Sequence, residues 1–178
     1  ILKEYAGVIR PKAVRRPHLR FETAPGVQGQ VDLSPYEVLL AGEPTDVVCF
    51  SLVLGFSRWQ FIRFFLHADA HAVCYGHVLA FEEAGGAPEE ILYDRMKQVV
   101  LESFRHRVVM HPLFEAMRRH YGEFRAVPLA PGYCEGKGKV ENPFGYVEGN
   151  FLRQHRRAGF RSLDELNEKA AAWLRDTA

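Results

Sequence analysis

The fold is decided in residues 28–66, which read QGQVDLSPYEVLLAGEPTDVVCFSLVLGFSRWQFIRFFL. This stretch is rich in valine and phenylalanine, which favour strands. Turn residues divide it into runs, and the pattern predicts strands at 28–40, 46–56 and 59–66. The run from Val47 to Phe56 is too short to span a membrane and is best interpreted as a central strand. We expect the three strands to be antiparallel.

The rest of the chain alternates between helical and strand patterns. These predict helices at 69–84, 111–121, 141–155 and 162–176, and strands at 90–94 and 124–129. Residues 95–110 show no clear pattern and receive no assignment. Three strands followed by alternating helices and strands predict an α/β fold, with a mixed sheet flanked by helices.

The last predicted helix has a signal at its start and a clear apolar face. Ser162 and Glu165 have the spacing of a capping box, in which each side chain bonds to the backbone near the other residue. One face of the helix is apolar and consists of Leu163, Leu166, Ala170 and Trp173. We therefore expect this helix to pack against the core.

Three acidic residues lie in settings where a charge needs an explanation. Asp32 lies inside the first predicted strand, and Asp94 closes an apolar run at the C-terminal end of a predicted buried strand. In open α/β sheets, ligands bind at that edge. Glu141 follows a Gly-Lys-Gly-Lys stretch and begins a predicted helix. If the fold brings the three together, they form a carboxylate cluster able to hold divalent metal against a phosphodiester.

These motifs, in this order, resemble the integrase-core (rve) domain of DDE transposases, specifically the IstA class of bacterial insertion-sequence transposases. Further matching segments are FETAPGVQGQVD (21–32), LGFSR (54–58), AFEEAGGAP (80–88), HYG (120–122) and FRSLDELN (160–167). The resemblance implies a ribonuclease H-like fold with a mixed five-stranded sheet. In that fold Asp32 lies on the first strand, Asp94 just after the fourth and Glu141 on a later helix. The stretch between Asp94 and Glu141 is longer than the one that names the retroviral integrase motif, which fits the transposase class.

The resemblance also implies a metal-dependent polynucleotidyl transferase. Asp32, Asp94 and Glu141 would bind two Mg²⁺ ions, for which Mn²⁺ can substitute, and Asp32 would bridge the pair. Two such ions about 3.5–4 Å apart can activate the attacking oxygen and stabilise the leaving one. No covalent protein nucleophile is expected. Water would cut the transposon 3′ end, and the freed 3′-hydroxyl would then attack target DNA.

Four basic residues are candidate DNA contacts. Lys137 and Lys139 stand just before the third acid, where they would flank the scissile phosphate. Arg95 directly follows the second acid and could bind phosphate or compete with the metal. Arg58 is a candidate DNA contact, and a salt bridge at a strand edge explains it about as well.

Three positions depart from the family's pattern. Leu33-Ser34 replaces the usual Trp-Gly after the first acid, and Arg95 replaces the usual Asn after the second. Pro143 stands where a helix former is common. Because proline is tolerated only in the first turn of a helix, we predict that this helix begins within a few residues of Glu141.

The composition fits one folded domain that is not strongly basic. The chain has 178 residues, of which 47% are hydrophobic and 25% charged, and its formal net charge is +1. Affinity for DNA therefore has to come from local patches. Arg153, Arg156, Arg157 and Arg161 form one such patch, which a solvated face also explains. We interpret residues 1–20 as a basic linker from a missing N-terminal DNA-binding region, and residues 21–178 as the catalytic core.

Neither the cysteines nor the histidines point to other chemistry. Cys49, Cys74 and Cys134 are far apart and odd in number, so we expect no disulfide framework and a reducing cytoplasm. His67 and His71 are four residues apart, but no HExxH or paired-cysteine pattern accompanies them. A zinc site is therefore not expected.

The resemblance further implies partners and a location. The partners are double-stranded DNA, as transposon ends and as target, further copies of the protein in a homo-oligomer on DNA, and a helper AAA+ ATPase. The location is the nucleoid of the bacterial cytoplasm, and no membrane is involved. Two other functions stay open. One is a catalytically inactive DNA-binding or assembly scaffold with the same fold, and the other is a ribonuclease H-like nuclease that cuts without joining strands.

Overall fold

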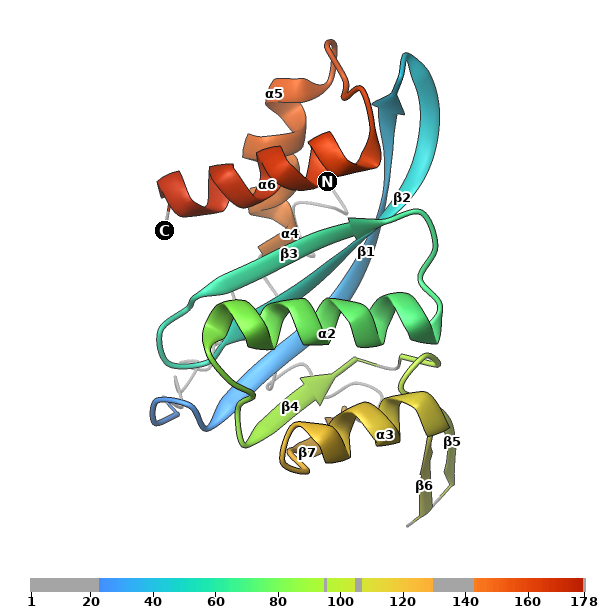
Figure 1. Cartoon of the computed structure of the whole chain (residues 1–178), viewed down its shortest axis with the longest axis vertical. Helices are drawn as coiled ribbons and strands as arrows, with labels where there is room; N and C mark the ends of the chain where they lie inside the picture. Colours follow the sequence, from blue (N-terminus) through green and yellow to red (C-terminus); the bar gives the residue numbers. More distant parts are fainter. Residues whose placement is uncertain (1–22, 95, 105–106, 130–142, 178) are drawn as a thin grey trace, which may run out of the picture.

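The strand β1 (Gln28–Leu40) runs through the middle of a five-stranded mixed sheet (Figure 1). The computed structural model of the chain describes residues 23–94, 96–104, 107–129 and 143–177. The strand order is β3-β2-β1-β4-β7. Strands β2 (Glu43–Leu54) and β3 (Gln60–Phe65) follow β1 in antiparallel pairs, whereas β4 (Glu90–Tyr93) and β7 (Arg125–Pro128) extend the sheet in parallel. The predicted mixed five-stranded sheet is confirmed, with strand ends that shift by a few residues.

Alternation of side chains along the strands gives the sheet two apolar faces. The α2 face, covered by α2 (Ala70–Ala84) and α3 (Pro112–His120), includes Val31, Phe50, Leu52 and Phe61. The α6 face includes Val38, Cys49, Ile62 and Phe64. In Figure 1, α2 lies below β3 and α6 lies above it.

The α6 face is covered by one continuous helical segment and by α6 itself. The segment comprises α4 (Pro143–Tyr146), the π-helical turn η2 (Val147–Leu152) and α5 (Arg153–His155). Helix α6 (Leu163–Thr177) follows after a short turn. The predicted helix at 141–155 thus begins at Pro143 and changes to π-helix in its middle, a form that recurs at functional sites.

Helix α2 approaches the sheet closely because it has a glycine at the contact. A Cβ at Gly76 would lie 2.9 Å from Cγ of Phe50, which is closer than side chains pack. The helix is capped at its start by Asp69, whose carboxylate accepts a hydrogen bond from the Ala72 N–H at 2.8 Å. It ends at Gly85, where φ is +79°. The predicted helix at 69–84 is confirmed.

Asn167 fastens α6 to the edge of the sheet. Its buried side chain accepts a hydrogen bond from the Phe64 N–H at 2.7 Å and donates one to the Phe64 carbonyl at 3.0 Å. Because β3 is an edge strand, these backbone groups have no neighbouring strand on that side. The amide therefore satisfies two groups that would otherwise be buried without partners.

The predicted capping box at the start of α6 forms with one difference. The Glu165 N–H donates to Oγ of Ser162 at 3.2 Å, as predicted. The Glu165 carboxylate accepts from the backbone N–H of Arg161 at 2.5 Å, one residue earlier than a standard box requires. The predicted apolar face is confirmed, since the α6-face core includes Leu163, Leu166, Ala170 and Trp173.

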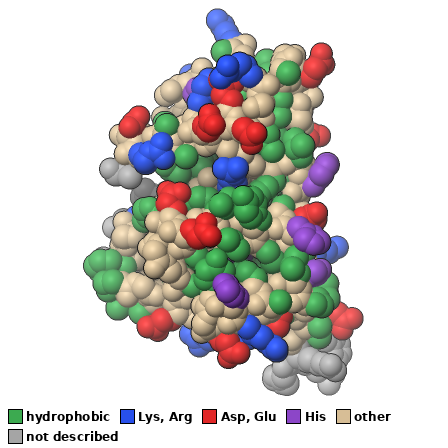
Figure 2. Space-filling view, in the orientation of Figure 1, with side chains coloured by type: hydrophobic (Ala, Val, Ile, Leu, Met, Phe, Trp, Pro, Cys, Tyr) green, Lys and Arg blue, Asp and Glu red, His purple; other side chains and the backbone are tan. Residues whose placement is uncertain are grey.

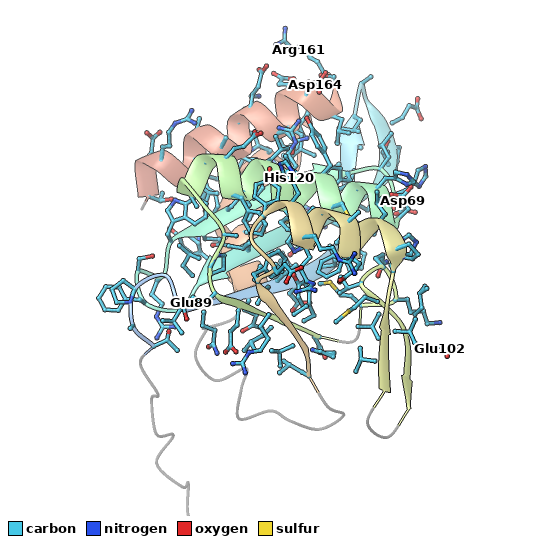
Figure 3. The ribbon with its side chains drawn as sticks, turned by 60° about the horizontal axis from the view of Figure 1, so that its bottom comes forward. Asp69, Glu89, Glu102, His120, Arg161 and Asp164 are labelled. Atoms are coloured by element: carbon cyan, nitrogen blue, oxygen red, sulfur yellow. The ribbon has the colours of Figure 1, made fainter. Side chains whose placement is uncertain are left out.

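The unassigned residues 95–110 contain a hairpin that stands apart from the main sheet. Strands β5 (Val100–Phe104) and β6 (Arg107–Met110) pair only with each other among the described strands. Figure 3, in which Glu102 marks β5, shows that the hairpin extends away from the rest of the chain. Its register shifts between Val100 and Glu102, and this irregularity explains why no clear period was visible in the sequence. None of the described helices is long and apolar enough to cross a membrane.

The close contact of α2 with the sheet predicts the effect of adding one methyl group. We expect Gly76→Ala to lower the free energy of unfolding by about 1–3 kcal/mol, because Phe50 and its backbone must move to admit the Cβ. Gly149→Ala is the matched control, since a Cβ there meets no atom within 4 Å. Chemical denaturation of both variants tests this. Equal stability of the two variants would contradict the packing argument.

Candidate active site

Asp32 and Asp94 occupy the same level on adjacent strands. The last pair in parallel register between β1 and β4 is Val31 with Tyr93, and the two acids come next. Neighbouring strands lie about 4.8 Å apart, so the two backbones are close where the acids leave them. Val31 and Tyr93 belong to the core of the α2 face. By alternation, both carboxylates are therefore expected on the α6 face.

Asp32 belongs to a row of polar groups that crosses three strands. Its Oδ1 accepts a hydrogen bond from the Leu33 N–H at 2.9 Å, and its partner residue on β2 is Ser51. Ser51 is 1% exposed, and its Oγ accepts a hydrogen bond from Nε2 of Gln60 on β3 at 3.1 Å. The sequence analysis missed Ser51 and Gln60. A lone serine inside an apolar run was the available signal, because a buried hydroxyl needs a partner.

Tyr93, the residue before Asp94, is tied to helix α2 by a buried hydrogen bond. Its hydroxyl lies 3.0 Å from Nε2 of His77, and Nδ1 of His77 lies 2.7 Å from the Val73 carbonyl. The carbonyl can only accept, so Nδ1 carries the proton and Nε2 accepts from the tyrosine. Burial lowers the pKa of His77 to about 4, so the ring is neutral at pH 7. Burial also raises the pKa of Tyr93 well above its usual value, which keeps the phenol protonated.

The helix that follows Glu141 begins over the strand that holds Asp32. Glu141 itself lies outside the described residues. Pro143 is the first described residue of α4, and the stretch around Glu141 in which the helix is predicted to start lies outside the described residues. The hydroxyl of Tyr36, on β1, donates to the Phe144 carbonyl at 3.3 Å. This bond anchors the beginning of α4 on the α6 face.

The basic residues proposed to contact DNA fall in different places. Lys137, Lys139 and Arg95 lie outside the described residues. Arg58 lies in the turn between β2 and β3, with φ of +63°. This turn follows Leu54, which pairs with Gly29, three positions before Asp32 on β1.

A groove begins close to Asp32 and runs along the free edge of β1. From Asp32 to Val38 no described strand pairs with this edge, whereas the Phe160 N–H donates to the Leu39 carbonyl at 2.8 Å at its end. The η2 segment forms the opposite wall of the groove. The cavity has a volume of about 890 Å³ and starts at Pro35, three residues after Asp32. Gly145 and Gly149 have no side chains, so the helical wall projects little into the groove at these two positions.

Arginines gather at the far end of this groove. Arg153 and Arg156 line it, and Arg157 follows them; all three are exposed and form no ion pair with any described residue. Glu37 and Glu148 line the groove as well. Figure 2 shows Lys and Arg side chains at the upper end of the molecule, where α5 and the start of α6 lie in Figure 1. Unpaired arginines on a surface are free to bind phosphates.

The two described acids suit a hard divalent cation. Mg²⁺ in proteins is often held by one or two carboxylates and otherwise by water and substrate phosphate oxygens. Asp32 and Asp94 would supply two such carboxylates. Within the described ranges, no three histidine, cysteine or acidic side chains come together as a metal site. The third predicted ligand, Glu141, lies outside those ranges.

Solved structures define the class of fold. The catalytic core domain of HTLV-2 integrase, in complex with magnesium, superimposes with a TM-score of 0.59 over 84% of this chain and 86% of that chain, at 15% sequence identity. The integrase in a simian T-cell lymphotropic virus intasome gives a TM-score of 0.58 over 74% of this chain and 41% of its own. The chain therefore has the ribonuclease H-like fold of integrase catalytic cores, as the sequence predicts.

Sequence relatives narrow the class to transposases of insertion sequences. The IS640 transposase of Shigella sonnei is 34% identical over 173 residues, which is 96% of this chain and 54% of the relative. The IS21 transposase of Pseudomonas aeruginosa is 34% identical over 177 residues, 96% of this chain and 44% of the relative. The chain thus spans about half the length of these relatives. No protein-family model matches it. The resemblance to insertion-sequence transposases is confirmed across nearly the whole chain.

Proposed function

We propose that this chain is the catalytic core of a DDE transposase that cuts transposon 3′ ends and joins them to target DNA. The observation that carries the proposal is the register of β1 and β4, in which Asp32 and Asp94 each directly follow the last pair, Val31 with Tyr93. Similarity to insertion-sequence transposases along 96% of the chain supports the same activity.

The three acids would bind the metal ions in different ways. Asp32, at the centre of the sheet, would bridge two sites, with Asp94 and Glu141 each serving mainly one. Two bound Mg²⁺ ions, or Mn²⁺ in their place, would supply a polarised attacking oxygen and charge stabilisation for the leaving oxygen. The carboxylates must be ionised to do this. No covalent protein nucleophile would take part.

The groove along β1 offers a path for the DNA backbone away from the acids. It starts beside Asp32, and its wall from Gly145 to Arg156 is about 16 Å long at 1.5 Å per residue. At 3.4 Å per nucleotide this length accommodates roughly five nucleotides. Arg153, Arg156 and Arg157 would then neutralise phosphates. Lys137, Lys139 and Arg95 would contact DNA near the acids, and Arg58 would contact it at the turn between β2 and β3.

The full transposase would act as a homo-oligomer assembled on paired transposon ends. A helper AAA+ ATPase would direct it to target DNA on the bacterial nucleoid. We further propose that residues 1–20 link the core, residues 21–178, to a DNA-binding region. These assignments rest on the sequence similarity to insertion-sequence transposases.

Removal of single charges tests the catalytic assignment. We expect Asp32→Asn, Asp94→Asn and Glu141→Gln each to lower cleavage and strand transfer at least about a thousandfold, because each loss weakens metal binding worth several kcal/mol. DNA binding should persist in all three. The measurement is cleavage and joining of labelled transposon-end DNA by the full-length protein with Mg²⁺.

The controls for this test are exposed acids far from the site. Asp46→Asn and Glu83→Gln make the same chemical changes at exposed positions and should leave activity unchanged. If the wild type binds and assembles on DNA but never cuts it, the scaffold function is correct. If it releases nicked product without joined product, the nuclease function is correct.

Salt dependence of binding tests the groove. We expect Arg153→Gln with Arg156→Gln to reduce the slope of log K against log salt by about 2, because two phosphate contacts are lost. Arg119→Gln with Arg175→Gln removes the same charge from exposed positions outside the groove. Binding of a duplex in the absence of Mg²⁺, titrated at several salt concentrations, measures both slopes. Equal slopes for the two double variants would place the DNA elsewhere.

A further inference from the structure

The hydrogen bond between His77 and Tyr93 joins helix α2 to the last residue of β4 before Asp94. We propose that His77 and Tyr93 are positioning residues that set the place of Asp94 relative to Asp32. The inference rests on the proposed function, because it matters only if these acids bind metal together. It adds two residues on the α2 face, the side of the sheet away from the acids.

Tyr93 is held in two directions by different elements. Within the sheet, it pairs with Val31 on β1, and its carbonyl accepts a hydrogen bond from the Leu129 N–H at 2.8 Å. Perpendicular to the sheet, its hydroxyl reaches His77 at 3.0 Å. Strand β4 has only four residues and lies between β1 and β7, so the bond to His77 adds a direction that the sheet does not supply. Because Asp94 is the next residue, the position of the Tyr93 backbone constrains the position of the Asp94 backbone.

His77 is itself unable to move. It is 0% exposed, and its Nδ1–H donates to the Val73 carbonyl at 2.7 Å. Its ring centre lies 5.1 Å from that of Phe50 and 5.7 Å from that of Phe114, in edge-to-face geometry. The acceptor Nε2 therefore has one fixed position from which it can hold the tyrosine hydroxyl.

Stability alone does not explain a polar pair in this aromatic core. Two apolar side chains of the same shape would fill the space with little change in stability, because no buried group would be left unpaired. What an apolar pair lacks is a directional bond that fixes the end of β4. Metal-ligand carboxylates need such fixing, and loss of an outer partner typically weakens metal affinity 10–100-fold.

The test compares variants that remove the bond with variants that keep it. Tyr93→Phe removes the donor and His77→Leu the acceptor, whereas His77→Gln keeps an acceptor of similar reach. Leu166→Ala, in the α6-face core, is the control for general destabilisation. The measurements are the melting temperature, Mn²⁺ affinity by electron paramagnetic resonance, and the separation of the Asp32 and Asp94 carboxylates in crystal structures.

We expect Tyr93→Phe and His77→Leu to weaken Mn²⁺ binding by about tenfold or more, with a changed carboxylate separation. His77→Gln should retain most of the affinity, and Leu166→Ala should lower the melting temperature without changing the affinity. Tyr93→Phe and His77→Leu binding Mn²⁺ as tightly as Leu166→Ala would overturn the inference.

A failure of the proposed function gives a different result. If Asp32→Asn and Asp94→Asn bind Mn²⁺ as the wild type does, or if the wild type binds none, the assigned metal site is wrong. The carboxylate separation then decides the positioning role alone. A separation unchanged by Tyr93→Phe overturns that role, and a changed separation supports it.

Discussion

The parallel pairing of β1 with β4 is the constraint on which the site depends. Asp32 and Asp94 are 62 positions apart in the chain, and each directly follows the last pair in the register of β1 and β4, Val31 with Tyr93. Because side chains alternate with a period of two, a slip of one residue would turn one acid into the apolar core of the α2 face. The burial of Val31, Ile91 and Tyr93, each 0% exposed, opposes such a slip. The hydrophobic core thus specifies the geometry of the charged site.

The helices on the two faces contact the sheet in different ways. Helix α2 packs tightly through Gly76 and contains the only described histidine that is fully buried, which bonds to Tyr93. On the α6 face the contacts are at the margins of the sheet, where Asn167 pairs with the edge of β3 and Tyr36 holds the start of α4. Between these anchors the helical segment leaves the edge of β1 open. A rigid α2 face therefore supports an α6 face that is accessible to a large substrate.

The likeness to retroviral integrase cores is a likeness of fold, at 15% identity. It shows that the ribonuclease H-like scaffold needs few particular residues, because many apolar sequences satisfy the same alternation. The similarity to insertion-sequence transposases is of another kind, since it reaches 34% sequence identity over 96% of this chain. The distant similarity thus describes the fold, and the closer similarity relates the chain to insertion-sequence transposases.

The sequence by itself determined the elements, because alternation and helical periodicity are local. It placed β1 at its observed bounds, began the site helix near Glu141 through Pro143, and put Asp94 at the end of a buried strand. It could not determine the hairpin at 100–110, whose irregular register breaks the strand period.

Only the tertiary structure decided which residues meet. Gln60, His77 and Tyr93 act through partners on other elements, and no local pattern distinguishes them from ordinary core or surface residues. The groove at β1 likewise exists only because β4 ends at Tyr93 while β1 continues to Leu40. Local patterns specify helices and strands, whereas a site is a set of distances between them, and packing alone fixes those distances.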